Sequence, residues 1–173
     1  MSVGLRAEAA GVYHLDSGNT QVSFDVQRFG IQWVRAHFQD ISGEFVLDRQ
    51  GTSSRVDVIV GIASVDCDDP RWNDRLRSPE WLDAQRFPQM IYHADHIELG
   101  DGRATATGEL TLHGVTRAVV LNVTFVNCES AATCHFTAHA RIKRSAYGLP
   151  HGFWMGGDQV NISISGAVDG DSG

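Results

Sequence analysis

The stretch Asp68–Pro88, DDPRWNDRLRSPEWLDAQRFP, has a pattern that no β-strand would carry. Asp69 followed by Pro70 is a typical helix start, because an acidic N-cap accepts hydrogen bonds from the first amides and proline there loses none. Ser78-Pro79 repeats the signal a few residues later. We therefore predict a short helical segment at about residues 69–84.

The predicted segment comprises two helical turns, over about residues 70–77 and 79–84. It carries large apolar side chains together with several charges, so one side of it has to be buried. The apolar side chains are those of Trp72, Leu76, Trp81, Leu82 and Phe87. We expect the segment to lie across one end of a β-rich body.

The rest of the chain alternates apolar and polar residues with the period of two that is typical of half-buried strands. Short turns join most of these stretches. They cover about residues 21–27, 34–47, 56–62, 91–99, 104–112, 118–126, 136–142 and 160–165. In the second stretch the apolar positions change parity near Gln39-Asp40, which indicates a bulge or a bend. Long antiparallel strands with one apolar face favour an all-β, eight-stranded antiparallel barrel.

Length and charge limit the classes of function. A chain of 173 residues is typical of one domain, and we expect that domain over residues 12–168, with flexible termini at 1–11 and 169–173. The net charge of −7 argues against a nucleic-acid partner, because phosphate contacts require a positive face. No apolar run approaches the ~18 residues of a membrane span. Met1–Ala10 lacks the apolar core of a signal peptide, so the chain is either cytoplasmic or already mature.

Metal and catalytic sites are not predicted. His93 and His96 would point to opposite faces of one strand, so they cannot bind the same ion. His135 and His139 share a face but would be about 13 Å apart. The chain contains no G-x-S-x-G nucleophile elbow and no dinucleotide or P-loop glycine pattern after a strand. We expect no metal, no cofactor and no catalytic residue.

Five motifs resemble the YceI-like family and occur in that family's order. They are Tyr13–Asp16 followed by Val22–Phe24, Ser42–Phe45, Asn73–Asp83 with Phe87-Pro88, Gly108–Thr116 and Arg144–Leu149. The resemblance implies a lipocalin-like barrel whose interior holds a polyisoprenoid lipid or another long-chain amphiphile. Most bacterial members are periplasmic. This chain has Asn19 and Arg28 at positions where members often have histidine.

The resemblance makes the inward-facing residues candidates for lining a lipid tunnel. They are Phe24, Val26, Val58, Val60, Leu121, Val123, Phe125, Phe136, Ile142 and Ile162. The alternative is that these side chains meet and fill the barrel as an ordinary core. Small residues leave room between them, namely Ala104, Ala106, Gly108, Ala138 and Ala140.

A glycine-rich segment at about residues 148–157 forms either a mouth of the tunnel or an ordinary exposed loop. Four residues in it or beside it are candidates for the mouth: Arg144, Tyr147, His151 and Trp154. We include Tyr147 and Trp154 among the predicted ligand contacts.

The state of the cysteines depends on the cellular compartment of the protein. Cys128 and Cys134 bracket a short loop between consecutive strands, an arrangement that could bring their Cα atoms within the ~4.4–6.8 Å that a disulfide needs. The alternative is a pair of thiols in a reducing cytosol. The family's usual compartment favours the bridge, and Cys67 is then left as a thiol.

The predicted function is the binding, sequestration or transport of a polyisoprenoid or similar lipid, without chemistry on it and in the periplasm. Two alternatives stay open: an enzyme that acts on an isoprenoid or quinone-type lipid, and an interaction domain with a filled core. A homodimer is also left open.

Overall fold

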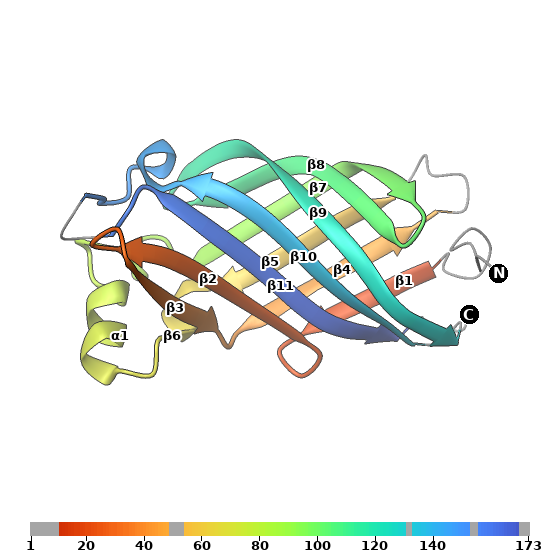
Figure 1. Cartoon of the computed structure of the whole chain (residues 1–173), viewed down its shortest axis with the longest axis horizontal. Helices are drawn as coiled ribbons and strands as arrows, with labels where there is room; N and C mark the ends of the chain where they lie inside the picture. Colours follow the sequence, from red (N-terminus) through yellow and green to blue (C-terminus); the bar gives the residue numbers. More distant parts are fainter. Residues whose placement is uncertain (1–10, 49–53, 131–132, 153–155, 170–173) are drawn as a thin grey trace.

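The computed structural model describes residues 11–48, 54–130, 133–152 and 156–169. Eleven antiparallel strands in these ranges form one sheet that curls into a barrel-like body (Figure 1). Their bounds are β1 Gly11–Asp16, β2 Thr20–Arg28, β3 Gln32–Phe38, β4 Ile41–Leu47, β5 Arg55–Gly61, β6 Val65–Asp66, β7 Gln89–Gly100, β8 Arg103–Leu112, β9 Val115–Ser130, β10 Thr133–Lys143 and β11 Gln159–Asp169. The predicted all-β antiparallel barrel is confirmed.

The predicted number of eight strands is wrong, because two long strands are each broken in the middle. The order in the sheet is β1-β4-β5-β7-β8-β9-β10-β11-β2-β3-β6. Val22 of β2 pairs with Phe38 of β3, and Asp16 of β1 pairs with Ser42 of β4. Hence β1 with β2, and β3 with β4, are the two arms of one long bent hairpin. One arm bends between β1 and β2. The other bends between β3 and β4, at residues 39–40, where the parity change was predicted.

The two bends and the two-residue strand β6 account for the additional strands. At the first bend, the Asp16 carboxylate accepts hydrogen bonds from the amides of Gly18 (2.6 Å) and Asn19 (3.1 Å) and so turns the chain between β1 and β2. At the second, the Ser64 hydroxyl accepts from the amides of residues 39 and 40, both at 3.0 Å. Ser64 belongs to a short 3₁₀ helix, Ile62–Ser64, that follows β5.

The helix α1, Pro70–Arg77, lies across one end of the barrel (Figure 1). Asp69 is its N-cap and accepts from the amide of Arg71 at 3.0 Å, as the sequence predicted. The side chain of Arg77 ties the helix to the barrel, because its Nε donates to the Ala63 carbonyl oxygen at 2.7 Å. The second predicted helical turn, over residues 79–84, is wrong: these residues form a series of turns.

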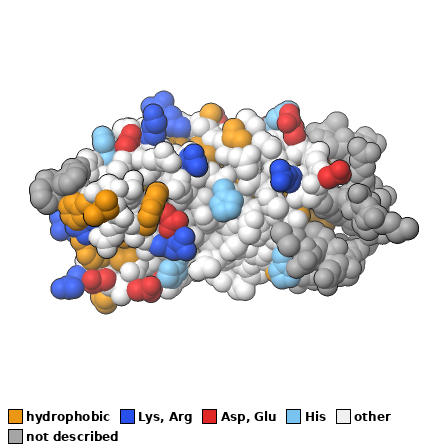
Figure 2. Space-filling model, viewed as in Figure 1, with side chains coloured by type: hydrophobic (Ala, Val, Ile, Leu, Met, Phe, Trp, Pro, Cys, Tyr) orange, Lys and Arg blue, Asp and Glu red, His pale blue; other side chains and the backbone are white. Residues whose placement is uncertain are grey.

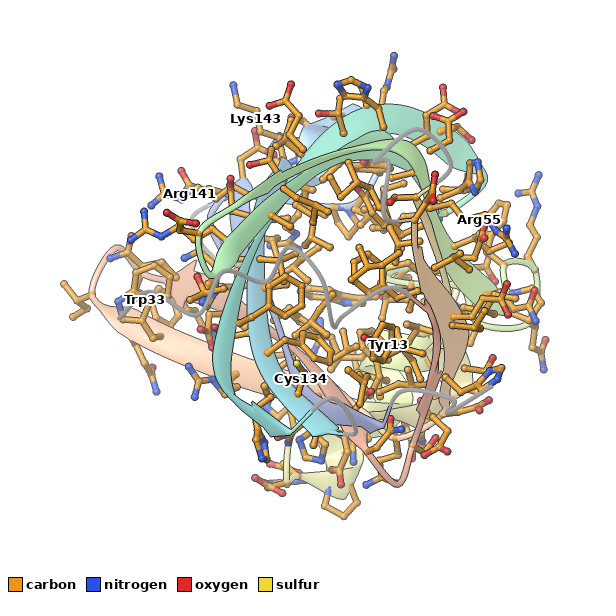
Figure 3. The ribbon with its side chains drawn as sticks, turned by 90° about the vertical axis from the view of Figure 1, so that its right-hand side faces the viewer. Tyr13, Trp33, Arg55, Cys134, Arg141 and Lys143 are labelled. Carbon is orange, nitrogen blue, oxygen red and sulfur yellow. The ribbon has the colours of Figure 1, made fainter. Side chains whose placement is uncertain are left out.

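Alternation along the strands places the apolar side chains inside. In β5, Val56, Val58 and Val60 are all buried, whereas Arg55 and Ile59 are exposed. Figure 3 looks along the barrel from the end opposite α1 and shows the same division. The side chains of Tyr13 and Cys134 lie inside the ring of strands, and those of Arg55, Arg141 and Lys143 lie outside it.

Candidate functional site

Three cavities follow one another along the inside of the barrel. The wide compartment, at the α1 end, has a volume of about 290 Å³. The middle and far compartments are narrower, at about 40 and 50 Å³. Val22, Met90 and Ile162 line both the wide and the middle compartments. Val58, Leu121 and Ile164 line both the middle and the far ones. The cavities therefore lie end to end along the barrel interior, and together they are called the bore below.

The wide compartment lies between the hairpin β2–β3 and the segment that contains α1. Phe24, Val26 and Val34 form the strand wall, and Trp72 and Trp81 cover the end. The Trp72 and Trp81 rings meet edge to face with their centroids 6.4 Å apart. At about 290 Å³ the compartment is close to the lower end of the ~300–1,000 Å³ range of small-molecule pockets.

Polar groups line the bore almost only in the wide compartment. They belong to Ser23, Arg28, Gln32, Asp69 and Arg144. The far compartment has only apolar lining residues, and Ala104, Ala106 and Ala138 keep it open. The bore thus has one polar end and one apolar end.

Tyr92 is the one residue with a polar side chain among those that line the middle compartment. Its hydroxyl oxygen lies 3.0 Å from the carbonyl oxygens of both Ala106 and Val119, to which it can donate its proton in turn. Burial raises the pKa of Tyr92 to about 12, so the group is neutral at physiological pH. Because the barrel wall accepts the proton of Tyr92, the middle of the bore behaves as an apolar passage.

Arg144 brings a buried positive charge to the wide compartment. It begins the 3₁₀ helix Arg144–Tyr147, and only 4% of its surface is exposed. Its Nη1 donates to the Gly157 carbonyl oxygen at 3.2 Å, and its Cζ lies 5.1 Å from the centroid of the Trp81 ring. Burial lowers the pKa of Arg144, and Asp158 opposes that shift. An arginine stays protonated even so, and it therefore brings a positive charge to this end of the bore.

Asp158 holds the 3₁₀ helix that carries Arg144. Its carboxylate accepts hydrogen bonds from the amide of Ser145 (2.7 Å) and from the Ser145 hydroxyl (2.8 Å). These two bonds stabilise the carboxylate and lower the pKa of Asp158. The position of the buried guanidinium is therefore set by the chain on both sides of the glycine-rich segment.

Trp81 supplies an unused donor. Its Nε1–H is buried and has no hydrogen-bond acceptor in the described ranges of the chain. A buried N–H without an acceptor costs about 1–3 kcal/mol, so a ligand atom that accepts this hydrogen bond gains binding energy. Together with Arg144, the wide compartment favours an acceptor or an anion.

The structure places ten of the predicted tunnel residues along the bore. Phe24, Val26, Ile142 and Ile162 line the wide compartment. Val60 lines the middle one, with Val58 and Leu121 where it meets the far one. Val123, Phe125 and Phe136 line the far compartment.

The glycine-rich segment only partly follows the prediction. Arg144 lines the wide compartment, whereas Tyr147 is buried beside it without lining any of the three cavities. His151 is exposed, and Trp154 lies outside the described residues. Sequence reasoning did not assign Trp72, Trp81 or Met90 to the site. The apolar side of the helical segment was the signal for the two tryptophans, because a segment that covers a barrel end also closes its cavity.

The cysteines lie at opposite ends of the barrel. Cys134 is disulfide-bonded, and Cys67 is free and lines the wide compartment. The side chain of the predicted partner, Cys128, lies outside the described part, so the pairing stays a prediction. Within the described ranges, no three His, Cys, Asp or Glu side chains are grouped so that they could hold a metal ion. No helix in those ranges is long and apolar enough to cross a membrane.

The chain is similar in sequence to a known domain and to several bacterial proteins. The YceI-like domain matches residues 13–168. A UPF0312 protein of Vibrio parahaemolyticus is 29% identical over 130 residues, which are 73% of this chain and 68% of that protein. Two further UPF0312 proteins, from Photorhabdus laumondii and Vibrio campbellii, are matched over 53% and 64% of their length.

Solved structures share the fold. Burkholderia cenocepacia BcnA superposes with a TM-score of 0.78 at 26% identity, over 88% of this chain and 98% of BcnA. A polyisoprenoid-binding domain from Saccharophagus degradans, implicated in plant cell wall breakdown, superposes with a TM-score of 0.69 over 93% of this chain and 99% of that one. At 13% identity the second likeness concerns the fold alone. Since the domain match spans nearly all of the described barrel, the chain belongs to the YceI-like family.

Proposed function

We propose that this protein binds one long-chain isoprenoid-type lipid inside the barrel and carries it without reacting with it. The observation that supports this most directly is the bore itself, in which three cavities share lining residues from one compartment to the next. A slender chain suits such a bore, because the middle and far compartments are too narrow for a bulky ligand. The polyisoprenoid-binding domain that shares the fold suggests the chemical class.

The lipid lies with its tail in the far compartment and its head group in the wide one. The far compartment is lined by apolar residues alone, and burial of each CH₂ group contributes about 0.8 kcal/mol. The head group meets Arg144 and the Trp81 N–H, which favour a hydroxyl, carbonyl or anionic group. A few isoprene units outweigh one such hydrogen bond, so the tail supplies most of the affinity and the head group sets the orientation.

The described groups of the bore support carriage rather than catalysis. Asp69 serves as the N-cap of α1, and Tyr92 donates to the barrel wall. Cys67 has its Sγ 3.8 Å from the Asp69 carbonyl oxygen, with no histidine among the residues that line the compartment. Nucleophilic catalysis by a cysteine needs an adjacent base, and the one carboxylate among the described lining residues, that of Asp69, is engaged as the helix N-cap.

The proposed cellular location of the protein is the periplasm. Two observations support it: the family assignment, since most bacterial members are periplasmic, and the disulfide at Cys134, since such bonds persist in oxidising spaces.

The test is to extract the purified protein with organic solvent and to identify the extracted lipid by mass spectrometry. We expect a prenyl or other long-chain lipid, and uptake of a prenyl alcohol by the delipidated protein. An extract without lipid, together with no uptake, would contradict the proposal. Release of a chemically altered lipid during incubation would instead establish the enzymatic alternative.

A matched pair of variants locates the ligand. Leu121 lines the bore, and its neighbour in β9, Val120, is 46% exposed on the outer face. Leu121→Glu should abolish uptake, because an unpaired carboxylate in an apolar bore is costly, whereas Val120→Glu should not change it. Melting curves separate loss of binding from unfolding. Equal uptake by the two variants would place the ligand elsewhere.

A further inference from the structure

The end of the molecule that carries the wide compartment also exposes its largest apolar side chains. Ile31 is 86% exposed and Trp33 57% exposed, both at the tip of the hairpin β2–β3. In Figure 2 hydrophobic side chains gather at this end, whereas only scattered ones are visible on the rest of this face. In Figure 3 the hairpin leaves the ring of strands and carries Trp33 outward.

The tip is a well-defined turn. Phe29 and Gly30 have φ values of 56° and 70°, and the amide of Ile31 donates to the Arg28 carbonyl oxygen at 3.3 Å. Two consecutive residues in the left-handed region form the turn whose twist matches that of a hairpin. The Gln27 amide group donates to the Gly30 carbonyl oxygen at 2.7 Å and closes the tip further. Because the tip is already ordered, little conformational entropy remains to be lost when it binds.

The tip and the wide compartment lie on two faces of the same hairpin. Gln32 and Val34 line the compartment, so by the alternation of β3 the side chain of Trp33 faces away from it. Ile31 lies just before β3 and is 86% exposed, so both side chains project into solvent beside the wide compartment.

Two guanidinium groups flank the tip on the side of α1. The Cζ atoms of Arg28 and Arg75 lie 4.8 and 5.3 Å from the centroid of the Trp72 ring. In the part of the chain that the structure describes, neither arginine forms an ion pair with a carboxylate. By contrast, Arg35, the next outward residue of β3 after Trp33, is paired with Asp25 at 2.7 Å. The tip thus combines exposed apolar side chains with two arginines that form no ion pair in the described part of the chain, although Asp74 and Glu80 of the same segment are also exposed.

We propose that this hairpin tip, Ile31 and Trp33 flanked by Arg28 and Arg75, docks on the surface of an anionic lipid bilayer. A lipid surface fits because tryptophan and arginine favour the interface between head groups and acyl chains, and a tip needs to reach only about 5–10 Å into it. A protein partner fits less well, since two projecting side chains are far short of the ~800 Å² per partner of a stable interface. Docking of the tip brings the wide compartment close to the lipid.

Because the net charge is −7, we expect only this end of the molecule to bind an anionic bilayer. A chain with this charge is repelled by an anionic surface in most orientations, so only an end with available cations can bind there. The purpose of docking, to bring a lipid carrier to its cargo, rests on the proposed function. Docking itself can be measured with lipid-free protein.

The test is flotation of the delipidated full chain with vesicles of phosphatidylcholine, with or without phosphatidylglycerol. The wild type should float with the anionic vesicles and much less with the neutral ones. Ile31→Asp should lower the partition coefficient at least about tenfold, the equivalent of one buried isoleucine. Arg75→Gln should lower it about fivefold at low salt, and the difference should vanish at high salt.

The matched control is Leu99→Asp. Leu99 is 49% exposed near the end of β7 that lies opposite α1, so the same substitution there should not change flotation. The proposal would be overturned if the wild-type protein did not float with anionic vesicles. It would also be overturned if Leu99→Asp and Ile31→Asp reduced flotation equally. A lipid-free dimer that Ile31→Asp dissociates would show that a second copy covers the tip instead. Ile31→Asp should still take up prenyl alcohol from detergent. Failure of membrane docking can then be distinguished from failure of lipid binding in the bore.

Discussion

Closing the far compartment should shorten the lipid that the protein can hold. Ala138 is 1% exposed in β10 and lines this compartment, whose volume is about 50 Å³. Ala138→Leu adds three carbon atoms to the cavity and excludes roughly three CH₂ equivalents of ligand. At ~0.8 kcal/mol each, a ligand that reaches this compartment loses about 2.4 kcal/mol, or about 50-fold in affinity. A shorter ligand should lose nothing.

The assay is calorimetric titration of the delipidated protein with prenyl alcohols of increasing chain length. For the wild type, affinity should rise with each isoprene unit and reach a plateau when the bore is full. In Ala138→Leu the plateau should come at a shorter chain. Thr137→Leu is the matched control, because Thr137 is the preceding residue and is exposed. An equal loss of affinity at every chain length would refute the proposed orientation, and melting curves account for the ~1–3 kcal/mol that overpacking costs.

Three further changes have defined outcomes. Because burial raises the folded-state pKa of Tyr92 from 10.0 to about 12, its contribution to stability is present below pH 10 and is lost as the pH rises towards 12. In denaturant unfolding, Tyr92→Phe should therefore lose less stability over this range; equal losses would contradict the buried hydroxyl. Protein purified from an oxidising compartment should show one free thiol, Cys67, under denaturing alkylation, and reductant should raise the count to three and lower the melting temperature; three thiols before reduction would exclude the Cys134 bridge. Asp158→Ala removes two hydrogen bonds to Ser145, so uptake should weaken with only a small change in melting temperature, whereas unchanged uptake would separate the 3₁₀ helix from ligand binding.

Local signals predicted the parts of the fold that depend on neighbouring residues. Asp69 and Pro70 are sufficient to start α1, since capping is a contact between adjacent groups. The turns at residues 79–84 were mistaken for a helix. In the structure the amide of Asp83 bonds to the Ser78 carbonyl oxygen five residues back, whereas an α-helix pairs residues four apart. Strand alternation predicted which residues face inward, but not whether their side chains fill the barrel or leave a cavity. The volume between them depends on strands far apart in the sequence.

The chemistry at the end of the bore was harder to predict. Arg144 stands next to a glycine-rich segment, where a charged side chain is normally exposed, yet the structure buries it against Trp81 and Gly157. No sequence rule brings residues 81 and 144 together. The exposed apolar tip was missed for a different reason. Alternation with Val34 and Ala36 places Trp33 on the outer face, but it does not show whether another element covers that face. The class of ligand came from the family resemblance.

The pairing of β11 with β2 has a consequence for how the chain folds. Ile164 lies opposite Val22, so the last strand of the barrel completes the sheet beside one of the first. Contacts between such distant residues give a high contact order, and domains of this kind fold in milliseconds to seconds. The barrel wall therefore stays incomplete until nearly the whole chain is present. A chain that is exported can cross a membrane as an unfolded thread, and it can enclose a lipid only after its final strand has arrived.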